Sequence, residues 1–404
     1  MVKPERRTKA DLVAAAAIVA VLAAVAALIW WTSDARTTIS RPAAIQAPSP
    51  TPARQVPAAL RQLWTAASPA TDRPVVVGGT VVTGDGHRVN GRDSVTGESR
   101  WSYSRDSDLC AASWVYRYAV AVYRDDRGCG QVSTIDGSTG QRGPSRSSYA
   151  DKHIDLSSDG STVLSAGTTR LELWRSDLVR MLSYGEIDAR VKPSSHGLHS
   201  GCTLVSAAAS SSAVSVLEAC QKKTDLRLAL LRPSKEEDEP EQRKVPETGI
   251  EPGSGARVLT VSETSTAVYL PSPQPRVEVV DETGVTVAST PLPKPASPAS
   301  AISRLGGLIS WWTGDSVMVF DAANLRYRST IGADGPAIPL GPAAMMAGRL
   351  LVPVTGGVGV YDPVSGVNER YIPVSRPPGT SAVIPVVSGS QVFEQRGHTV
   401  VALG

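Results

Sequence analysis

Residues 91–101 of the chain read GRDSVTGESRW, and this stretch decides the fold. It follows two short β-branched runs within residues 75–82 and a turn at Asp85-Gly86. Aspartate closes a tight turn through its side-chain carboxylate, and glycine adopts the positive φ that such a turn requires. The unit therefore predicts antiparallel strands joined by tight turns, with Asp93 as a turn residue and not as a catalytic one.

Partial copies of this unit recur along the chain. An apolar or β-branched pair followed by aspartate and a turn occurs at 134–140, 279–284, 319–325 and 360–366. Aspartates of neighbouring copies are about 40 residues apart, the length of one four-stranded propeller blade. Two degenerate units, at 171–175 and 226–231, fit the wider gap between the second and third copies. The repeat predicts an all-β fold: a β-propeller of about eight four-stranded blades, or alternatively seven.

The unit resembles the repeat of quinoprotein-type propellers, which reads A-x-D-x-x-T-G-x-x-x-W. The match is good over residues 91–101, weaker at the later copies and poor between residues 150 and 245. The resemblance covers about the last 340 residues and implies the propeller fold. Repeats of this type also occur in the non-enzymatic lipoprotein subunit of the outer-membrane β-barrel assembly machine, so the resemblance does not imply an enzyme.

The two ends of the repeat region predict how the ring closes. Residues 392–404 supply inner strands but stop before an outer strand. The stretch LRQLWTAA at 60–67 precedes the first full blade and carries Trp64 at the aromatic position of the repeat. Pairing the two segments in one sheet leaves no open edge. We therefore expect residues 60–67 to complete the last blade and to bury Trp64.

The N-terminal stretch 12–31, LVAAAAIVAVLAAVAALIWW, is apolar throughout. A helix of about 20 residues is about 30 Å long, which matches one hydrocarbon core. Basic residues precede it, so the positive-inside rule places residues 1–11 in the cytoplasm and the rest of the chain outside the cytoplasmic membrane. A cleaved signal peptide is the alternative, but its apolar core is typically only about 7–15 residues. The Arg- and Ala-rich composition is typical of a high-GC bacterium such as an actinobacterium.

Residues 32–59 are rich in Pro, Ala, Ser and Thr and show no apolar period. Proline stiffens such a chain toward polyproline II and prevents regular pairing. We therefore predict a Pro-rich extracytoplasmic linker that spaces the membrane helix from a propeller domain at 60–404. The acidic run 235–241 predicts a blade loop that extends into solvent.

The four cysteines all lie in the part of the chain predicted to be outside the cytoplasm, where disulfides form. They fall into two local pairs with nearly equal separations. We expect Cys110 to pair with Cys129 and Cys202 with Cys220, each bridge joining neighbouring strands. Four cysteines allow two other pairings, which the sequence alone leaves open.

No catalytic, cofactor-binding or metal site is predicted. In the quinoprotein dehydrogenases that the repeat resembles, adjacent cysteines help to hold the cofactor. No two cysteines are adjacent in this sequence, so the resemblance does not imply a cofactor site here. His196 and His199, just before Cys202, have the residue types of a zinc site, but a disulfide-bonded Cys202 could not be a ligand. The formal net charge of only +3 disfavours nucleic-acid binding, which needs clustered Lys and Arg.

Three functions are compatible with these features. The first is a non-catalytic scaffold or adaptor, held in the membrane by its N-terminal helix, that binds another cell-envelope protein. The second is a sensor or carrier for a small molecule, glycan or lipid, and the third is a quinone-dependent oxidoreductase. In the pair Trp311-Trp312 we expect one side chain in the core and the other at a partner or ligand surface, because adjacent strand residues face opposite sides.

Overall fold

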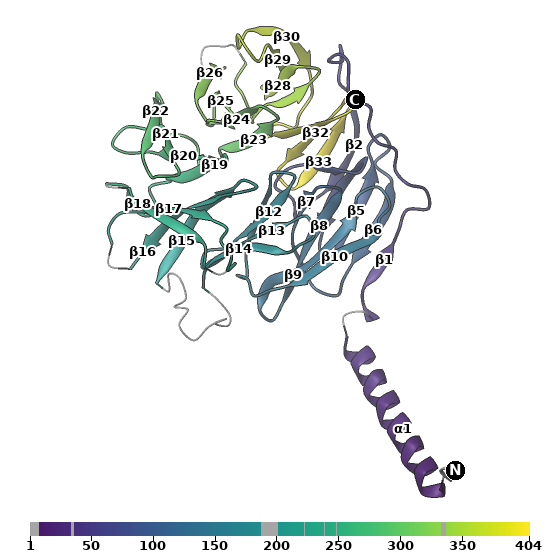
Figure 1. The fold of residues 1–404 in the computed structure, drawn as a ribbon. Helices are drawn as coiled ribbons and strands as arrows, with labels where there is room; N and C mark the ends of the chain where they lie inside the picture. The colour runs from purple at the N-terminus through teal and green to yellow at the C-terminus, as the bar shows by residue number, and fades with distance from the viewer. Residues whose placement is uncertain are drawn as a thin grey trace, which may run out of the picture.

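The computed structural model describes residues 8–33, 36–186, 201–221, 223–237, 239–247, 249–332 and 337–404. One helix, α1 (Lys9–Thr32), stands apart from a propeller of β-strands (Figure 1). By length and composition α1 could span a membrane, and none of its residues is buried against the rest of the described chain. The helix begins after Thr8, whose hydroxyl accepts a hydrogen bond from the Asp11 N–H while the Asp11 carboxylate accepts one from the Thr8 N–H.

Eight four-stranded antiparallel blades form the propeller, as the repeat predicts. From the inner to the outer strand, blades 1 to 4 contain β3 (Val75–Val77), β4 (Thr80–Asp85), β5 (Arg88–Asp93) and β6 (Ser99–Ser104); β7 (Leu109–Val115), β8 (Tyr118–Asp125), β9 (Gly128–Asp136) and β10 (Arg142–Ser147); β11 (Asp155–Ser158), β12 (Thr162–Ala166), β13 (Arg170–Arg175) and β14 (Arg180–Gly185); and β15 (Cys202–Ala209), β16 (Val214–Cys220), β17 (Arg227–Arg232) and β18 (Glu241–Pro246).

In the same order, blades 5 to 8 contain β19 (Arg257–Val261), β20 (Ser265–Leu270), β21 (Arg276–Asp281) and β22 (Thr286–Pro291); β23 (Ala301–Leu305), β24 (Leu308–Trp312), β25 (Val317–Asp321) and β26 (Tyr327–Ile331); β27 (Ala344–Met346), β28 (Arg349–Val354), β29 (Gly357–Tyr361) and β30 (Asn368–Pro373); and β31 (Ile384–Ser388), β32 (Gln391–Arg396), β33 (Thr399–Leu403) and β2 (Gln62–Ala67). The two degenerate units of the sequence are blades 3 and 4.

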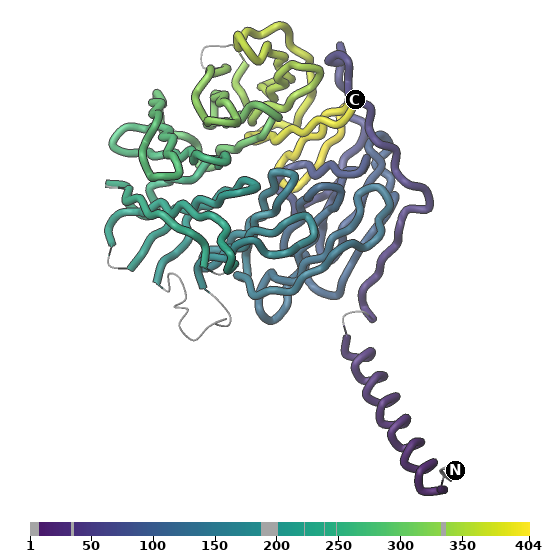
Figure 2. The backbone as a smooth tube through the Cα atoms, viewed as in Figure 1, coloured from purple at the N-terminus to yellow at the C-terminus, as the bar shows by residue number. Residues whose placement is uncertain are grey.

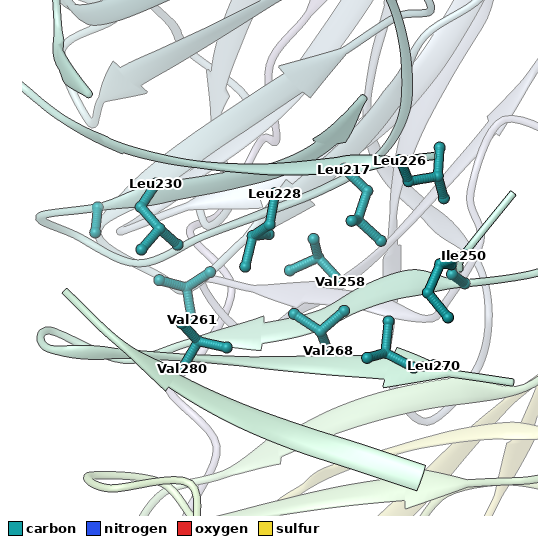
Figure 3. Packing of buried hydrophobic residues seen from close by; sticks show 12 residues of the cluster. Leu217, Leu226, Leu228, Leu230, Ile250, Val258, Val261, Val268, Leu270 and Val280 are labelled. Carbon is teal, nitrogen blue, oxygen red and sulfur yellow. The ribbon is translucent and has the colours of Figure 1, made fainter. Parts of the chain in front are cut away.

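The hydrophobic core consists of layers between neighbouring blades. Figure 3 shows the layer in which Leu217 and Leu228 of blade 4 pack against Val258 and Val268 of blade 5. Because neighbours cover both faces of a blade, a middle strand such as β24 is buried at every residue. Such strands therefore read as continuous apolar runs and not as alternating ones.

The prediction that Trp311 or Trp312 lies at a partner surface is wrong, since the two side chains are 1% and 2% exposed. They do face opposite sides of blade 6, but Trp311 packs in the layer shared with blade 5 and Trp312 in the layer shared with blade 7. Their indole N–H groups donate to the Ser300 hydroxyl and the Pro339 carbonyl. Both tryptophans are therefore core residues.

Strand β2 closes the ring by pairing antiparallel with β33, so the N-terminal strand completes the last blade. Trp64 of β2 is 9% exposed, contacts Phe393, and donates its indole N–H to the Ser94 carbonyl of blade 1 at 3.1 Å. Its ring lies on Gly97, where φ is +74° and an added Cβ would come within 2.6 Å of Trp64 Cγ. The strand pairing and the buried tryptophan agree with the closure that the sequence predicts.

The Pro-rich segment is not the spacer that its composition predicts, because most of it lies on the propeller. Strand β1 (Ile39–Arg41) pairs with β6 and gives blade 1 a fifth strand. The Ala43 and Ala47 N–H groups then donate to the carbonyls of Thr139 and Ser138 in a turn of blade 2.

The same segment continues to blades 7 and 8. Val56 and Leu60 are buried in the layer between these blades, and Arg370 donates to the carbonyls of Val56 and Pro57. We call residues 39–60 the strap; Figure 2 shows it running along the side of the propeller. A Pro-rich chain has few N–H groups to satisfy and stays extended, so it can lie along a folded surface. Only residues 33–38 connect α1 to β1.

Both predicted disulfides are present, and no cysteine is free. Cys202 of β15 and Cys220 of β16 are direct cross-strand partners, as expected. Cys110 and Cys129 lie in β7 and β9, with β8 between them, so the expectation of neighbouring strands is wrong for this bridge. Register shifts near Cys110 and at the end of β8 allow the bridge to form there.

Candidate functional site

The aspartates of the repeat are turn residues, as predicted. Five of them each accept hydrogen bonds from two backbone N–H groups of their own turn: Asp93, Asp136, Asp281, Asp321 and Asp362. The bond from the Ser365 N–H is the largest effect that lowers the pKa of Asp362. A carboxylate that is held ionised and has its acceptor positions occupied is a poor general base.

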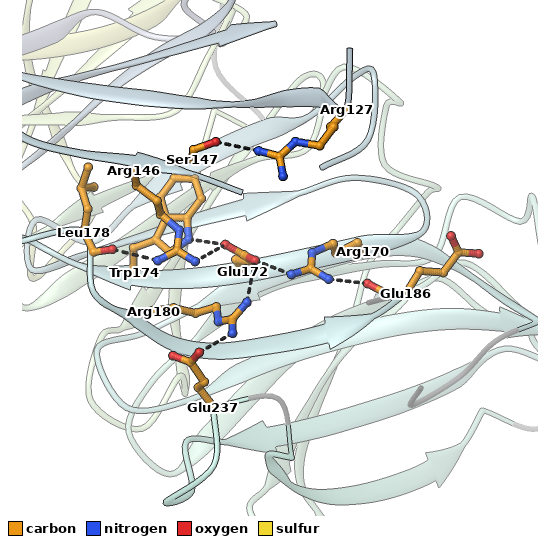
Figure 4. Close-up of polar contacts among 10 residues, drawn as sticks. All are labelled: Arg127, Arg146, Ser147, Arg170, Glu172, Trp174, Leu178, Arg180, Glu186 and Glu237. Carbon is orange, nitrogen blue, oxygen red and sulfur yellow. Dashed lines mark hydrogen bonds and ion pairs between the residues drawn. The ribbon is translucent and has the colours of Figure 1, made fainter. Parts of the chain in front are cut away.

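Three arginines surround one buried carboxylate at the junction of blades 2 and 3 (Figure 4). Glu172 Oε1 accepts from Arg170 and, at 3.2 Å, from Arg180 Nη1. Its Oε2 accepts from Trp174 Nε1 at 2.8 Å and lies 3.2 Å from Arg146 Nη2. Burial alone would raise the pKa of Glu172, but the ion pairs with Arg170 and Arg146 outweigh it and hold the pKa below its ordinary value. This cluster joins blades and offers no free base.

The acidic run belongs to the same region. Lys235 and Glu236 are exposed, as predicted for a loop in solvent, but Glu237 contacts blade 3. The Glu237 carboxylate pairs with Arg180, and its carbonyl accepts from the Ser183 N–H of β14 at 2.7 Å. Strand β14 is the outer strand of blade 3, and such an edge has unpaired N–H groups that a loop can cover. Asp238, in the same run, lies outside the described residues.

One group of side chains resembles a metal site in residue type, with ligand atoms within 4.8 Å of one another: Cys202, Glu218 and Cys220. The two sulfur atoms are bonded to each other, and Glu218 accepts from Arg227 Nε at 2.7 Å. A disulfide and a guanidinium-paired carboxylate do not offer the ligands that zinc needs. His196 and His199 lie outside the described residues, so nothing tests the prediction about them.

One face of the propeller carries exposed apolar side chains at equivalent positions. In an antiparallel blade the first and third turns lie on one face, which we call the turn face. Valines are exposed in or beside the third turn of blades 1, 3, 5 and 7: Val95, Val179, Val285, Val364 and Val367. Val364 is 84% exposed, and Ile45 of the strap, beside the turn of blade 2, is 78% exposed. Single exposed valines are ordinary, but these recur at one turn of the repeat.

A central cavity of about 1150 Å³ is lined by the inner strands. Its walls carry several serine hydroxyls and five charged side chains: Asp72, Arg73, Asp159, Arg257 and Arg304. The turn face and this channel are two features of the described chain that could receive a partner or a ligand.

No protein-family model and no curated protein matches the chain. Among solved structures, BamB from Moraxella catarrhalis is 14% identical with a TM-score of 0.50, and the match covers 85% of this chain and 99% of BamB. The shared fold is that of an eight-bladed β-propeller. The dihydro-heme d1 dehydrogenase NirN, in complex with DHE, is 17% identical with a TM-score of 0.48 over 86% of this chain and 72% of NirN. At 14% identity the likeness to BamB shows the fold alone.

Sequence reasoning missed the strap contacts, the arginine cluster and the charges of the channel. The sequence contains one indication of the arginine cluster, because Glu172 lies between Leu171 and Leu173 within an apolar strand. A charged residue in such a position requires a buried partner of opposite charge. The partners themselves come from three strands with no shared spacing, so the sequence does not identify them.

Proposed function

We propose that this protein is a non-catalytic, membrane-anchored scaffold that binds another protein of the cell envelope through its turn face. The observation that carries the proposal is the recurrence of exposed valines at equivalent turns of four blades, together with exposed Ile45 of the strap beside the turn of blade 2. Apolar side chains gathered on one face favour protein association. The repeat aspartates and Glu172 have structural roles, which also supports a binding role over a catalytic one.

The anchor supports this proposal by limiting where a partner can be. Residues 33–38 span at most about 25 Å between the end of α1 and the first residue of β1. Because β1 is part of blade 1, the propeller would stay close to the membrane and would not swing on a long tether. A partner on the turn face would therefore be a protein of the same membrane or of the space next to it.

Photo-cross-linking in native membranes tests the binding face. A photo-reactive residue at Val95 or Val364 is expected to give one discrete cross-linked product, and mass spectrometry should identify the same envelope protein from both positions. Asp126 and His398, in second turns on the opposite face, are exposed control positions. Equal cross-linking of that protein from the control positions, or products only from them, would contradict the assignment of the turn face.

The orientation of the chain needs its own measurement. The basic residues before α1 favour a cytoplasmic N-terminus by the positive-inside rule, and two disulfides suit an oxidising compartment outside it. Alkaline phosphatase fused after Gly404 should therefore be active, while a reporter that works only in the cytoplasm should be silent at the same position. The reverse result would show that the propeller is cytoplasmic and would end the envelope proposal.

A further inference from the structure

We propose that the central channel contains a binding site for a small anion, a phosphate or carboxylate compound, formed by Arg73 and Arg304. The site would lie inside the ring, whereas the proposed scaffold function uses the turn face. It is therefore a second binding function that can succeed or fail independently of the first.

Arg304 is positioned by the backbone of two other blades. It lies in inner strand β23 of blade 6, and its Nη2 donates to the Ala209 carbonyl at 3.2 Å, in blade 4. The same nitrogen donates to the Thr260 hydroxyl at 2.9 Å and the Val261 carbonyl at 2.8 Å, in blade 5. Among the described residues no partner contacts Nε or Nη1 of Arg304, and the side chain lines the cavity. The guanidinium is thus held in place with donors left over.

Arg73 faces the same cavity from blade 1. It precedes β3, and its Nη1 donates to the Ile302 carbonyl at 3.3 Å, two residues before Arg304 in β23. Its Nε lies 3.5 Å from the Asp72 carboxylate, and both of these side chains are well exposed. Two guanidinium groups from different walls therefore converge on one space.

The side chains that line this space carry more positive than negative charge, although Asp155 lies near Asp72 of the lining. Three arginines and two aspartates line the cavity, so the lining has a formal charge of +1. Asp159 is committed to its own turn, where Oδ1 accepts four hydrogen bonds from Ser161 and Thr162. In the part of the chain that the structure describes, neither Arg257 nor Arg304 has an ion-pair partner.

The electrostatics around Arg304 agree with this geometry. Burial lowers the pKa of the Arg304 guanidinium, Asp159 opposes that effect, and repulsion from Arg73 lowers the pKa further. Arginine nevertheless remains charged in proteins. A bound anion would relieve the repulsion between the two cations and would accept from their free N–H groups. Planar guanidinium groups match the oxygens of phosphates and carboxylates in particular.

The channel has room for such a ligand. Its volume of about 1150 Å³ compares with about 300–1000 Å³ for typical small-molecule sites. Hydroxyl groups on the same walls could bind neutral parts of the compound: Ser157, Ser300 and Ser303.

Isothermal titration calorimetry of the full-length protein in detergent tests the site, with inorganic phosphate and citrate as separate probes. At least one probe is expected to bind with a dissociation constant near or below about 1 mM. Arg73→Gln and Arg304→Gln should each weaken that binding by about tenfold or more, since each removes a charged donor. Arg328→Gln is the matched control, because Arg328 lies on the outer strand β26 of the same blade and pairs there with Asp321. This variant should leave binding unchanged.

Each result of the titrations leads to a different conclusion about the ligand. Binding of phosphate alone assigns phosphate compounds to the site, and binding of citrate alone assigns carboxylates. If Arg304→Gln lowers the melting temperature through its lost bonds to blades 4 and 5, Arg73→Gln still decides. Among the described residues Arg73 makes one hydrogen bond and one exposed ion pair, with Asp72. No heat with either probe up to about 10 mM, or equal affinity of Arg73→Gln and the unchanged protein, would overturn the proposal.

Discussion

A soluble chain that begins at Val75 is expected to aggregate or remain unfolded, whereas one that begins at Thr37 should fold. Removing β2 leaves β33 as an open edge at the ring closure and empties the site that Trp64 fills against Phe393 and Gly97. Truncating a buried tryptophan to alanine alone costs about 3–5 kcal/mol. That is a large part of the about 5–15 kcal/mol by which a typical domain is stable.

Thermal unfolding followed by circular dichroism measures this effect. Trp64→Ala in the chain from Thr37 should lower the melting temperature strongly, while Leu63→Ala, at a 42% exposed position of the same strand, should change it little. A chain that begins at Pro57 should fold but melt earlier than the one from Thr37, because it lacks β1 and the buried Ala47 and Val56 of the strap. Equal melting of the chains from Val75 and Thr37 would show that β2 does not hold the ring closed.

Glu172→Gln is expected to destabilise the propeller by about 3–5 kcal/mol at pH 7, because it removes one partner from a buried ionic cluster. Arg146 and Arg170 would lose their carboxylate, while Arg180 would keep only Glu237. Denaturant unfolding gives the change in the free energy of unfolding. Asp177→Asn, which removes an exposed pair with Arg175 in the same blade, is the matched control, and its cost should stay below about 1 kcal/mol.

The same variant should alter how stability depends on pH. Since the pKa of Glu172 lies below its ordinary value of 4.5, the unfolded chain takes up this proton first as the pH falls. The stabilisation by ionised Glu172 is therefore fully present above the ordinary value and is lost as the pH falls through the lower folded value. The stability difference between the unchanged protein and Glu172→Gln should narrow only below about pH 4.5. A constant difference down to pH 3 would contradict this role of the ion pairs.

The parts of the fold that could be predicted depend on short-range chemistry. Asp93 and its counterparts bond to N–H groups two to four residues away, so the turn is visible in the sequence and its recurrence gives the blade count. The closing strand could be predicted because one blade lacked its outer strand and Trp64 stood alone before the first blade. Local cysteine pairs were predictable for a similar reason, although the strands that Cys110 and Cys129 occupy were not.

The parts that could not be predicted depend on contacts between distant residues. Ala47 bonds to Ser138, Arg370 to Val56, and Arg304 to Ala209, and no spacing in the sequence relates these partners. Composition was misleading for the strap, since proline content predicts an extended chain but not whether that chain lies on a surface. Strand periodicity was misleading for Trp311 and Trp312, because it predicts opposite faces but not that neighbouring blades cover both.

The pairing of β2 with β33 also sets the order of events when the protein is made. β2 is synthesised before any full blade, but its partner strand is the last of the propeller. At about 5–20 residues per second, synthesis of the intervening chain takes on the order of half a minute. Throughout that time Trp64 and the edge strand have no partner. The ring can therefore close only after its last strand has been synthesised, and until then β2 is a segment that a chaperone or a second nascent chain could bind.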